Sequence, residues 1–347
     1  MTPSKYKVML VGYFGLGALE CSFNTAFIDI GCEVSCFDIS SLVQTNCRFG
    51  RAGQIFNRFV PVDAWVRKAN REMVLEARRF MPDVLVVFGQ NPVQAGALAQ
   101  IRSMMALKTV YIWPDTLVNL SAPMISVLPL YDLVATYSNS TVPLFERLGA
   151  KKVKWVPLAA DTKMHSVPDN PQNTAAGSIA DIAFIGQWRP ERERAVSAIL
   201  QAYPNIDLKI WGPDWGRRCK GKPGVLKCWQ GRPLYAQEFA TTVALSKINL
   251  NIIDDTNYPA ANMRFFEISC SGGLQACSQC PEMEGEFKHG ETVFYYKTLE
   301  ELTDMVHSLL QNDSLRKNVA QKANKIVLGK HTYIHRVTQI LDLLFGC

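Results

Sequence analysis

Two successive runs of short apolar segments constrain the fold of this 347-residue chain more than any other feature. The first run begins with a strand expected at residues 7–11, and the second begins with a strand expected at 182–185. Each run alternates strands with segments of helical periodicity, which is typical of a parallel sheet covered by helices on both faces. Between the runs, residues 167–178 are rich in Pro, Asn, Gly and Ser, as linkers are. The sequence therefore predicts an α/β protein with two domains.

The first run opens with a βαβ unit that contains a glycine-rich loop. The strand at 7–11 is followed by this loop, a helix expected at 18–30 and a strand expected at 33–38. The glycine spacing differs from the dinucleotide-binding fingerprint, and Asp38 alone is not enough to indicate a bound ribose. We interpret the loop as a place where a ligand approaches the backbone closely. Its residues of interest are Gly12, Phe14, Gly15 and Gly17.

Further apolar strands are expected at 84–88, 109–113 and 133–137. Functional side chains of open α/β sheets gather at the carboxyl ends of their strands. Asp115 and Ser138 each follow such an end, and we regard Asp115 as a catalytic candidate. Turn capping is the alternative for both residues, and for Ser138 it is the stronger interpretation.

In the second run, residues 262–275 carry the most informative chemistry. A buried strand expected at 247–253 leads into a short helix from about Asn262, which contains Arg264 and Glu267 and ends at a glycine pair. A carboxylate on such a helix can accept two hydrogen bonds from sugar hydroxyls. The alternative is an ordinary connection with an exposed glutamate.

The formal net charge of +6 is concentrated in one stretch, Arg48–Arg79. This stretch attracts an anionic acceptor or an anionic membrane surface, or else it is simply a solvated helix face. No segment approaches the roughly 20 apolar residues of a membrane span, and no signal peptide is recognisable, so we expect a cytoplasmic protein without a nucleic-acid partner. The basic residues are Arg48, Arg51, Arg58, Arg67, Lys68, Arg71, Arg78 and Arg79, against Asp63, Glu72 and Glu76.

The ten cysteines are scattered, and in a chain of this size we expect reduced, buried thiols. Cys270, Cys277, Cys280 and His289 form a possible zinc set. Only one Cys-x-x-Cys pair is present among them, so no metal site is expected.

Several segments of the second run resemble a known family. They include the helix and glycine turn at 264–273, the stretches 284–296 and 298–302, and the tail 331–336. In these segments the chain resembles group 1 glycosyltransferases of GT-B fold, in particular the spore-maturation CgeB-like branch. Residues 155–161 resemble the interdomain segment of that family, and 184–186 resemble its first donor-domain strand. The likeness extends over about 180–345 and is weak over 1–150.

The resemblance implies two Rossmann-like domains that face a central cleft. Residues 1–165 would form the acceptor-side domain, 166–179 the linker and 180–330 the domain that binds a nucleotide sugar. Residues 331–347 would form a helix that returns to the N-terminal domain.

The resemblance also implies a donor site. Glu267 would hold the ribose hydroxyls, Gly272 and Gly273 would form a turn near the nucleotide, and Arg189 and Arg264 would contact the diphosphate, as arginine can do bidentately. Arg189 and Arg264 are therefore catalytic candidates, beside Asp115. The remaining donor-site candidates are Gly186, Trp188, Gly212 and Asn262.

Two features depart from the family. The first of its two characteristic glutamates is replaced here by Pro259, so a sugar contact is either missing or supplied by Asp254, Asp255 or Asn262. The histidine that the family often carries in its N-terminal domain is absent, because all five histidines lie at position 165 or later. Asp115 is our candidate for its replacement.

The function implied is transfer of a sugar from a nucleoside diphosphate sugar to a glycan, glycolipid or protein acceptor, as in bacterial polysaccharide biosynthesis. The family suggests retention of configuration at the transferred carbon, and neither metal nor cofactor. A non-catalytic binding protein of the same fold and a sugar-nucleotide epimerase are the alternatives.

Overall fold

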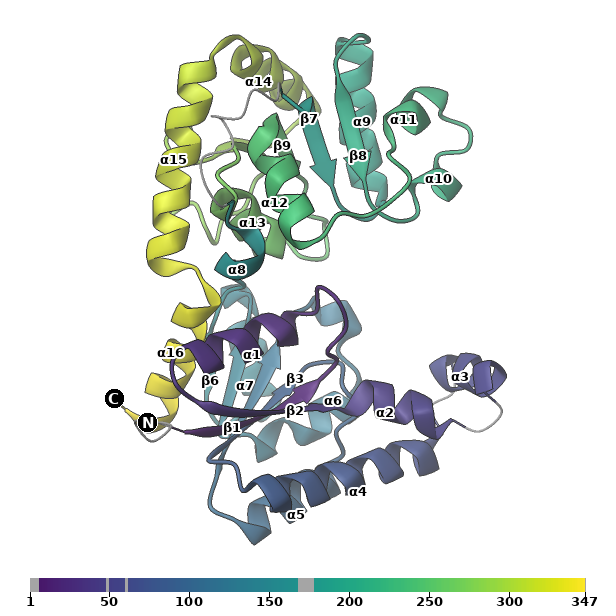
Figure 1. Cartoon of the computed structure of the whole chain (residues 1–347), viewed down its shortest axis with the longest axis vertical. Coiled ribbons are helices and arrows are strands. Elements are labelled where there is room, and N and C mark those ends of the chain that lie inside the picture. Colours follow the sequence, from purple (N-terminus) through teal and green to yellow (C-terminus); the bar gives the residue numbers. More distant parts are fainter. Residues whose placement is uncertain (1–5, 48–49, 60–61, 168–177, 347) are drawn as a thin grey trace. The chain divides into compact units, whose positions relative to one another are not determined.

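The computed structural model describes residues 6–47, 50–59, 62–167 and 178–346. The chain forms two compact units (Figure 1): unit 1 comprises Met1–Pro157 with Tyr333–Cys347, and unit 2 comprises Leu158–Thr332. Most of the linker expected at 166–179 lies outside the described residues. Among the described residues, no helix has both the length and the apolar character that crossing a membrane requires.

Unit 1 contains a six-stranded sheet in which every pair of neighbours is parallel. The strands lie in the order β2-β1-β3-β4-β5-β6. All five residues of β3 are buried, as expected for a strand covered on both faces. The strands are β1 Lys7–Gly12, β2 Glu33–Asp38, β3 Val84–Phe88, β4 Lys108–Trp113, β5 Leu133–Thr136 and β6 Val153–Trp155.

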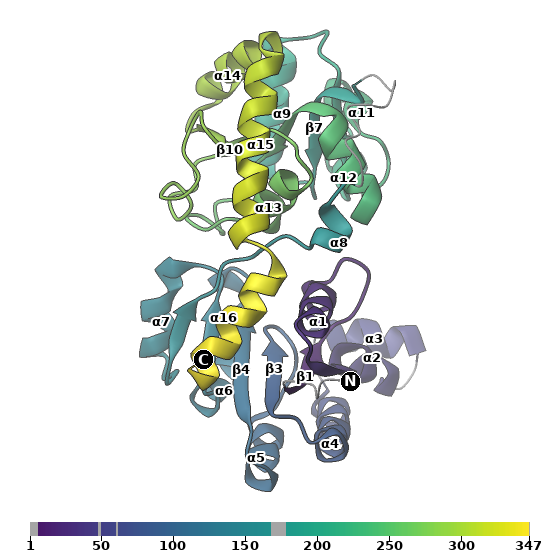
Figure 2. The ribbon, with the colours of Figure 1, turned by 60° about the vertical axis from the view of Figure 1, so that its left-hand side comes forward.

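Helices cover both faces of this sheet because alternate strand residues point to opposite sides. Met9 and Val11 of β1 belong to the core beneath α2, α4 and α5, whereas Val8 and Leu10 point to the other side and are equally buried. Figure 2 shows α1 and α16 on this unit, where they pack against each other. The helices are α1 Leu19–Asp29, α2 Ile39–Asn46, α3 Gly50–Phe59, α4 Asp63–Phe80, α5 Ala95–Met104, α6 Ala122–Val127, α7 Val142–Arg147 and α16 Tyr333–Phe345, with short 3-10 turns η1 Leu117–Asn119, η2 Leu128–Leu130 and η3 Asn139–Thr141.

The C-terminal helix α16 is part of unit 1. The Arg336 side chain donates to the Pro157 carbonyl (2.7 Å), and Phe345 stacks on Tyr6 with ring centroids 4.5 Å apart. Ile340 of this helix is fully buried. The chain thus returns to its N-terminal domain at its end, as the resemblance implies.

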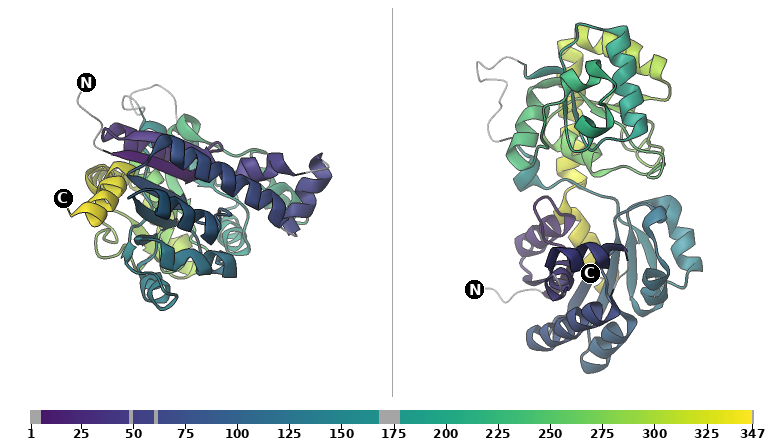
Figure 3. Two further views of the ribbon diagram at one scale, coloured as in Figure 1. Left: turned by 90° about the horizontal axis from the view of Figure 1, so that it is seen from below. Right: turned by 90° about the vertical axis from the view of Figure 1, so that its right-hand side faces the viewer.

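Unit 2 contains a five-stranded parallel sheet in the order β11-β10-β9-β7-β8. Ile182 and Phe184 of β7 face the core beneath α9 and α14, and Ala183 and Ile185 face the core beneath α12 and α13. Figure 3 gives two further views of these layers. The strands are β7 Ala180–Ile185, β8 Leu208–Trp211, β9 Ser246–Asn251, β10 Gln275–Ser278 and β11 Phe294–Tyr296, and the helices are α8 Thr162–His165, α9 Pro190–Ala202, α10 Trp215–Arg218, α11 Pro223–Cys228, α12 Ala236–Leu245, α13 Met263–Cys270, α14 Leu299–Gln311 and α15 Asp313–Lys330.

Strand order locates the place where each sheet can bind a ligand. In unit 1, β1 has β2 on one side and β3 on the other; in unit 2, β7 has β8 on one side and β9 on the other. Chain connections leave in opposite directions at such a switch point and open a crevice at the carboxyl ends of the strands. The predicted pair of Rossmann-like α/β domains is confirmed, and the candidate sites are expected at these two crevices.

Candidate functional site

Two glycine loops form one wall of the switch point in unit 2. Gly186 follows β7 and donates its N–H to the Trp211 carbonyl (2.8 Å) at the end of β8. Gly212 has φ +143°, and a Cβ atom there would collide with the Gly186 carbonyl oxygen. Only glycine permits the loops after β7 and β8 to approach this closely.

Arg192, in the first turn of α9, spans the switch point and was missed in the sequence analysis. Its guanidinium donates to the Gln187 carbonyl after β7 (2.9 Å) and to the Ile252 carbonyl after β9 (3.3 Å). The guanidinium also lies 5.9 Å from the centre of the Phe184 ring. Burial, the main cause, lowers the pKa of Arg192, and nearby Arg189 and Arg264 lower it further. Three arginines therefore gather at the carboxyl edge of this sheet.

Arg189 and Trp188 lie on the loop between β7 and α9. Arg189 is the exposed residue that caps α9. The Trp188 indole donates to the buried Glu193 carboxylate (2.7 Å), which also accepts from Lys222. These bonds fix the indole beside the arginine loop.

Helix α13 places Arg264 and Glu267 at the other wall of the crevice. The helix begins as predicted, with the Asn262 side chain accepting from the Phe265 N–H (3.0 Å). Arg264 donates through Nε to the Ile185 carbonyl (3.1 Å), packs over the Phe239 ring at 4.5 Å, and pairs with the Glu267 carboxylate. Glu267 is only 2% exposed, so it is not the exposed glutamate of an ordinary connection.

His165, at the end of α8, completes this group and was also missed. Its Nε2 lies 3.7 Å from Glu267 Oε1, and its Nδ1 accepts from the Asp161 N–H (3.4 Å). The proton of the neutral ring therefore sits on Nε2, on the side of the carboxylate. No local sequence signal links the two residues, because the fold alone brings them together across about a hundred positions of chain.

The loop after β9 holds the possible substitutes for the glutamate replaced by Pro259. Asp254 is buried and accepts from the Thr256 hydroxyl (2.7 Å) and the Asn257 amide (2.8 Å), 3.5 Å from Arg192. Asp255 is exposed. Of the two aspartates, Asp255 has the more accessible side chain.

Gly272 and Gly273 lie at the opposite edge of the sheet from the arginines. Gly272 has φ +75° and ends α13, and a Cβ on Gly273 would collide with Val243 and Asn249. Both precede β10, so they stand at the amino ends of the strands, whereas ligands of open α/β sheets bind at the carboxyl ends. Their observed roles are ending a helix and close packing, and we leave them out of the proposed donor site.

The four residues of the possible zinc set do not form a metal site. Within the described part of the chain, no group of three or more His, Cys, Asp or Glu side chains is arranged to hold a metal ion. His289 Nδ1 instead accepts from the Tyr295 N–H (3.1 Å). Burial raises the pKa of the Cys270 thiol to about 11.

The switch point of unit 1 carries the predicted glycine loop and a buried acid that the sequence analysis missed. Glu20, in α1, is 9% exposed and accepts from the Tyr13 N–H (3.1 Å). Asp38 accepts from the Phe14 N–H (3.2 Å) and caps α2. Burial, the main cause, raises the pKa of Glu20. Two carboxyl groups thus hold the loop that begins at Gly12, and its other glycines are Gly15 and Gly17.

Asp115 lies after β4, as predicted, and organises its own loop. Its carboxylate accepts from the Thr116 N–H (2.7 Å) and from the side-chain amides of Asn119 (2.6 Å) and Gln90. Ser138, after β5, exchanges a hydrogen bond with Ser140 (2.8 Å). The described contacts of Asp115 are those of a loop-capping carboxylate, and its catalytic role stays a prediction.

Comparison with known proteins adds a family likeness for most of unit 2 with part of α16, and a fold for the whole chain. Residues 189–342, less than half of the chain, match the family model described as glycosyl transferase-like. No curated protein matches the sequence.

Solved structures match nearly the entire chain. Sucrose-phosphate synthase from Thermosynechococcus elongatus has a TM-score of 0.70 at 10% identity, covering 98% of this chain and 99% of its own. HepE from Anabaena, in complex with UDP-glucose, has a TM-score of 0.65 at 13% identity, covering 99% and 100%. A glycosyltransferase from Rickettsia africae has a TM-score of 0.67 at 12% identity, covering 98% and 97%. Residues 189–342 are thus glycosyl transferase-like in sequence, and the chain has the two-domain fold of GT-B glycosyltransferases.

Proposed function

We propose that this protein transfers a sugar from a nucleoside diphosphate sugar to a glycan, glycolipid or protein acceptor. The observation that carries the proposal is the gathering of Arg189, Arg192 and Arg264 at the switch point of unit 2. Such a cluster is suited to binding a diphosphate, because guanidinium groups bind phosphate oxygens bidentately. Charge that develops on the leaving diphosphate would be stabilised by the same groups.

The amino end of α9 adds to this binding site. The helix spans Pro190–Ala202, and its first turn has backbone N–H groups without partners inside the helix. These groups favour an anion at the point where Arg189 caps the helix. The solved structures of HepE with UDP-glucose make uridine nucleotides the first donors to test.

Glu267 is proposed to bind the ribose hydroxyls after a change of partner at Arg264. Arg264 pairs with Glu267 and is one-third exposed, so it covers a carboxylate that is otherwise buried. A bound diphosphate would draw the guanidinium away, and the ribose hydroxyls would then take its place on Glu267. His165 would keep the second carboxylate oxygen oriented throughout.

Two further features of the reaction are proposed from the resemblance to the CgeB-like branch. The first is retention of configuration at the transferred carbon. The second is independence from metal, with the three arginines in place of a divalent cation. Asp115 stays our candidate on the acceptor side, together with the loop at Gly12. A cytoplasmic location fits this scheme, since nucleotide sugars are made there.

Calorimetric titration of UDP-, GDP- and dTDP-glucose into the full chain tests the donor site. We expect one of them to bind, and we expect Glu267→Gln to weaken it at least about tenfold, the loss of one charge-assisted hydrogen bond. Asp313→Asn is the matched control, because Asp313 also pairs with an arginine three positions away (Arg316, 2.9 Å) but lies at the amino edge. Equal losses in both variants would contradict the assignment of Glu267.

Metal independence is tested with the same titration in excess EDTA. We expect unchanged affinity and, once an acceptor is found, unchanged turnover. Loss of binding in EDTA, with recovery on adding Mg²⁺ or Mn²⁺, would contradict this part of the proposal.

A non-catalytic binding protein is the second candidate function. The replacement at Pro259 and the existing partners of Asp254 favour it, because both remove a free carboxylate near the donor sugar. Donor binding without transfer or hydrolysis, in extracts that contain the native acceptors, would support this candidate instead.

We also propose that the basic stretch Arg48–Arg79 contacts an anionic membrane surface. On α4, the exposed residues Lys68, Arg71 and Arg78 have no ion pair within the described part of the chain, and Leu75 between them is 63% exposed. Arg67 and Arg79 pair with acids of the same helix. Arg48 and the side chain of Arg58 lie outside the described residues.

Co-sedimentation with phosphatidylglycerol vesicles tests this contact. The triple variant Lys68→Gln/Arg71→Gln/Arg78→Gln should bind less than the wild type, and salt should weaken wild-type binding. The control removes three exposed lysines of α15, Lys317, Lys322 and Lys325. Equal binding to phosphatidylcholine vesicles would contradict an electrostatic contact.

A further inference from the structure

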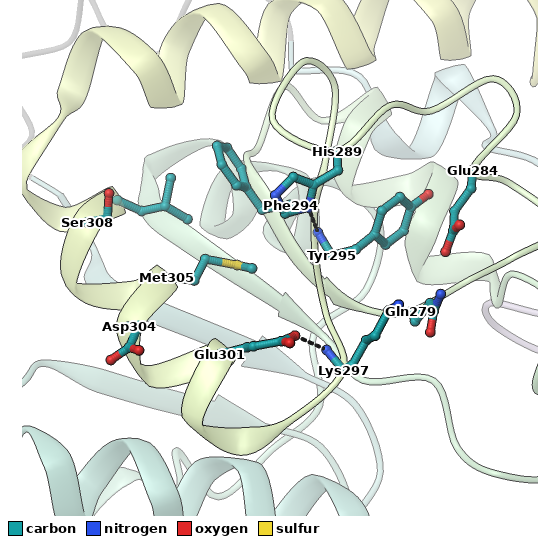
Figure 4. A pocket seen from close by; sticks show the side chains of 11 residues that line it. Gln279, Glu284, His289, Phe294, Tyr295, Lys297, Glu301, Asp304, Met305 and Ser308 are labelled. Atoms are coloured by element: carbon teal, nitrogen blue, oxygen red, sulfur yellow. Dashed lines mark hydrogen bonds between the residues drawn. The ribbon is translucent and has the colours of Figure 1, made fainter.

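A cavity of about 700 Å³ lies at the outer edge of the sheet in unit 2, away from the switch point (Figure 4). Its walls come from the loop after β10, from β11 and from α14. β11 is the edge strand and is separated from β9 by β10, which is about 10 Å at the usual strand spacing. The cavity is therefore not a part of the proposed donor site, and its volume lies within the usual range of small-molecule sites. Its lining residues are Gln279, Glu284, His289, Phe294, Tyr295, Lys297, Glu301, Asp304, Met305, Ser308 and Leu309.

The cavity combines an apolar wall with a polar rim. Phe294, Met305 and Leu309 supply the wall, and the Phe294 ring lies against the His289 imidazole with ring centroids 5.6 Å apart (Figure 4). His289 accepts through Nδ1 from the Tyr295 N–H, which leaves its other ring nitrogen for a further partner. An apolar surface with hydrogen-bonding groups around it matches a sugar ring, which has apolar faces and hydroxyls at its edges.

Tyr295 lines this cavity and carries an unpaired polar atom behind its wall. The residue is 8% exposed, and its hydroxyl has no hydrogen-bond partner in the described part of the chain. In Figure 4 the hydroxyl points toward Glu284, another lining residue. A buried hydroxyl without a partner costs free energy, and this one is enclosed by protein, so a hydroxylated ligand gains a bond to it only after the Tyr295 side chain shifts.

The charges at the rim decide which class of ligand fits. The lining contains three carboxylates, Glu284, Glu301 and Asp304, and one ammonium group, Lys297. One oxygen of Glu301 accepts a hydrogen bond from the backbone N–H of Lys297 (2.7 Å). Asp304 is exposed. Phosphorylated, sulfated or uronic ligands are repelled by this rim, whereas the hydroxyls of a neutral sugar can donate to it.

We propose that this cavity is a second saccharide site, which binds a neutral oligosaccharide outside the site of transfer. Such a site would hold a glycan chain on unit 2 while another part of the chain reacts. The proposal does not rest on the transfer reaction, because it needs only the cavity and its rim.

Saturation-transfer NMR and calorimetry with cellotetraose, maltotetraose and chitotetraose test the proposal on the full chain. We expect at least one of these neutral probes to bind at millimolar concentration or below, and tetragalacturonate not to bind. Ser308→Trp fills the cavity and should weaken binding at least about tenfold. Gln311→Trp is the control, since Gln311 is an exposed residue of the same helix that does not line the cavity.

Thermal melts establish that each variant is folded. Should Ser308→Trp fail to fold, Asp304→Ala removes an exposed acceptor and should weaken binding several-fold. UDP-sugar affinity should be the same in all these proteins, which separates this proposal from the donor site. Failure of all three neutral probes, undiminished binding in the cavity variants, or equal binding of tetragalacturonate would overturn it.

Discussion

Arg192 connects the two sides of the proposed donor crevice, since one guanidinium donates to carbonyls after both β7 and β9. Its buried position lowers its pKa, yet it keeps the charge that a diphosphate needs. The neighbouring Arg194, on the same helix, is exposed. The two arginines therefore carry the same charge on different faces of α9.

Arg192→Leu should weaken UDP-sugar binding by about tenfold to a hundredfold, the loss of a charge-assisted contact. Arg194→Leu removes the same charge from the same helix and should change affinity by less than about twofold. Calorimetry with the preferred donor measures both. Similar losses in the two variants would mean that net charge, and not the crevice, determines binding.

Glu20 gives the glycine loop of unit 1 a dependence on pH. Burial raises its pKa above the ordinary 4.5, so the folded state favours the protonated acid. The contribution of Glu20 to the free energy of unfolding is fully present below about pH 4.5 and is lost as the pH rises through the raised pKa.

Glu20→Gln should therefore match the wild type in melting temperature at acid pH and exceed it by a few degrees at pH 8. Thermal melts at both pH values measure the difference. Glu146→Gln changes an exposed carboxyl on α7, and its melting temperature should differ from that of the wild type by the same amount at both pH values. A constant difference for Glu20→Gln would contradict the direction of its pKa shift.

The sequence predicts these residues unevenly, for a physical reason. Glu267 and Arg264 lie within one helical turn of each other, so their pairing is encoded locally. Arg192 and His165 act through contacts with residues 60 to 102 positions away, as Arg192 with Ile252 and His165 with Glu267. Periodicity and motif spacing contain no information about such contacts.

Among the elements, α16 belongs to unit 1 although it follows unit 2 in the chain. Ile340 is fully buried there, whereas Ile334 on the same helix is 39% exposed. The buried face supplies the core contacts that hold the helix on its unit.

Ile340→Ala should lower the free energy of unfolding by about 2–5 kcal/mol, the usual cost of a cavity in a core. Ile334→Ala should cost no more than about 0.5 kcal/mol. Urea unfolding measures both values, and hydrogen exchange should locate the effect of Ile340→Ala in unit 1. Equal costs, or faster exchange confined to unit 2, would contradict the assignment of α16.

Strands were predicted well because parallel strands buried on both faces read as continuous apolar runs. The strand expected at 84–88 is β3, Val84–Phe88, and that expected at 33–38 is β2, Glu33–Asp38. The strand expected at 133–137 ends one residue earlier, as β5, Leu133–Thr136. Tyr137 is buried but follows the paired residues, so burial alone did not mark where pairing ends.

At the scale of the whole molecule, the two-unit architecture was predictable and the sites were only partly so. The two runs of strands indicate two Rossmann-like units, although the first unit ends at Pro157 and not at the expected linker. Identities of 10–13% to the solved structures described above show how little sequence the fold requires. The switch points follow from strand order, which the sequence does not state. Gly272 and Gly273 show the consequence, because a plausible glycine motif lies at the edge where ligands are not expected.

Hydrogen exchange of the full chain, with and without saturating UDP, tests the central claim most directly. Binding at the arginine crevice should slow exchange in peptides that cover 186–192 and 212–214, and should leave peptides that cover 271–275 unchanged. In the Arg192→Leu variant, a higher UDP concentration should be needed to slow exchange in these peptides to the same extent. Slowing confined to 271–275, or none anywhere in unit 2, would contradict a nucleotide site at the carboxyl edge of this sheet.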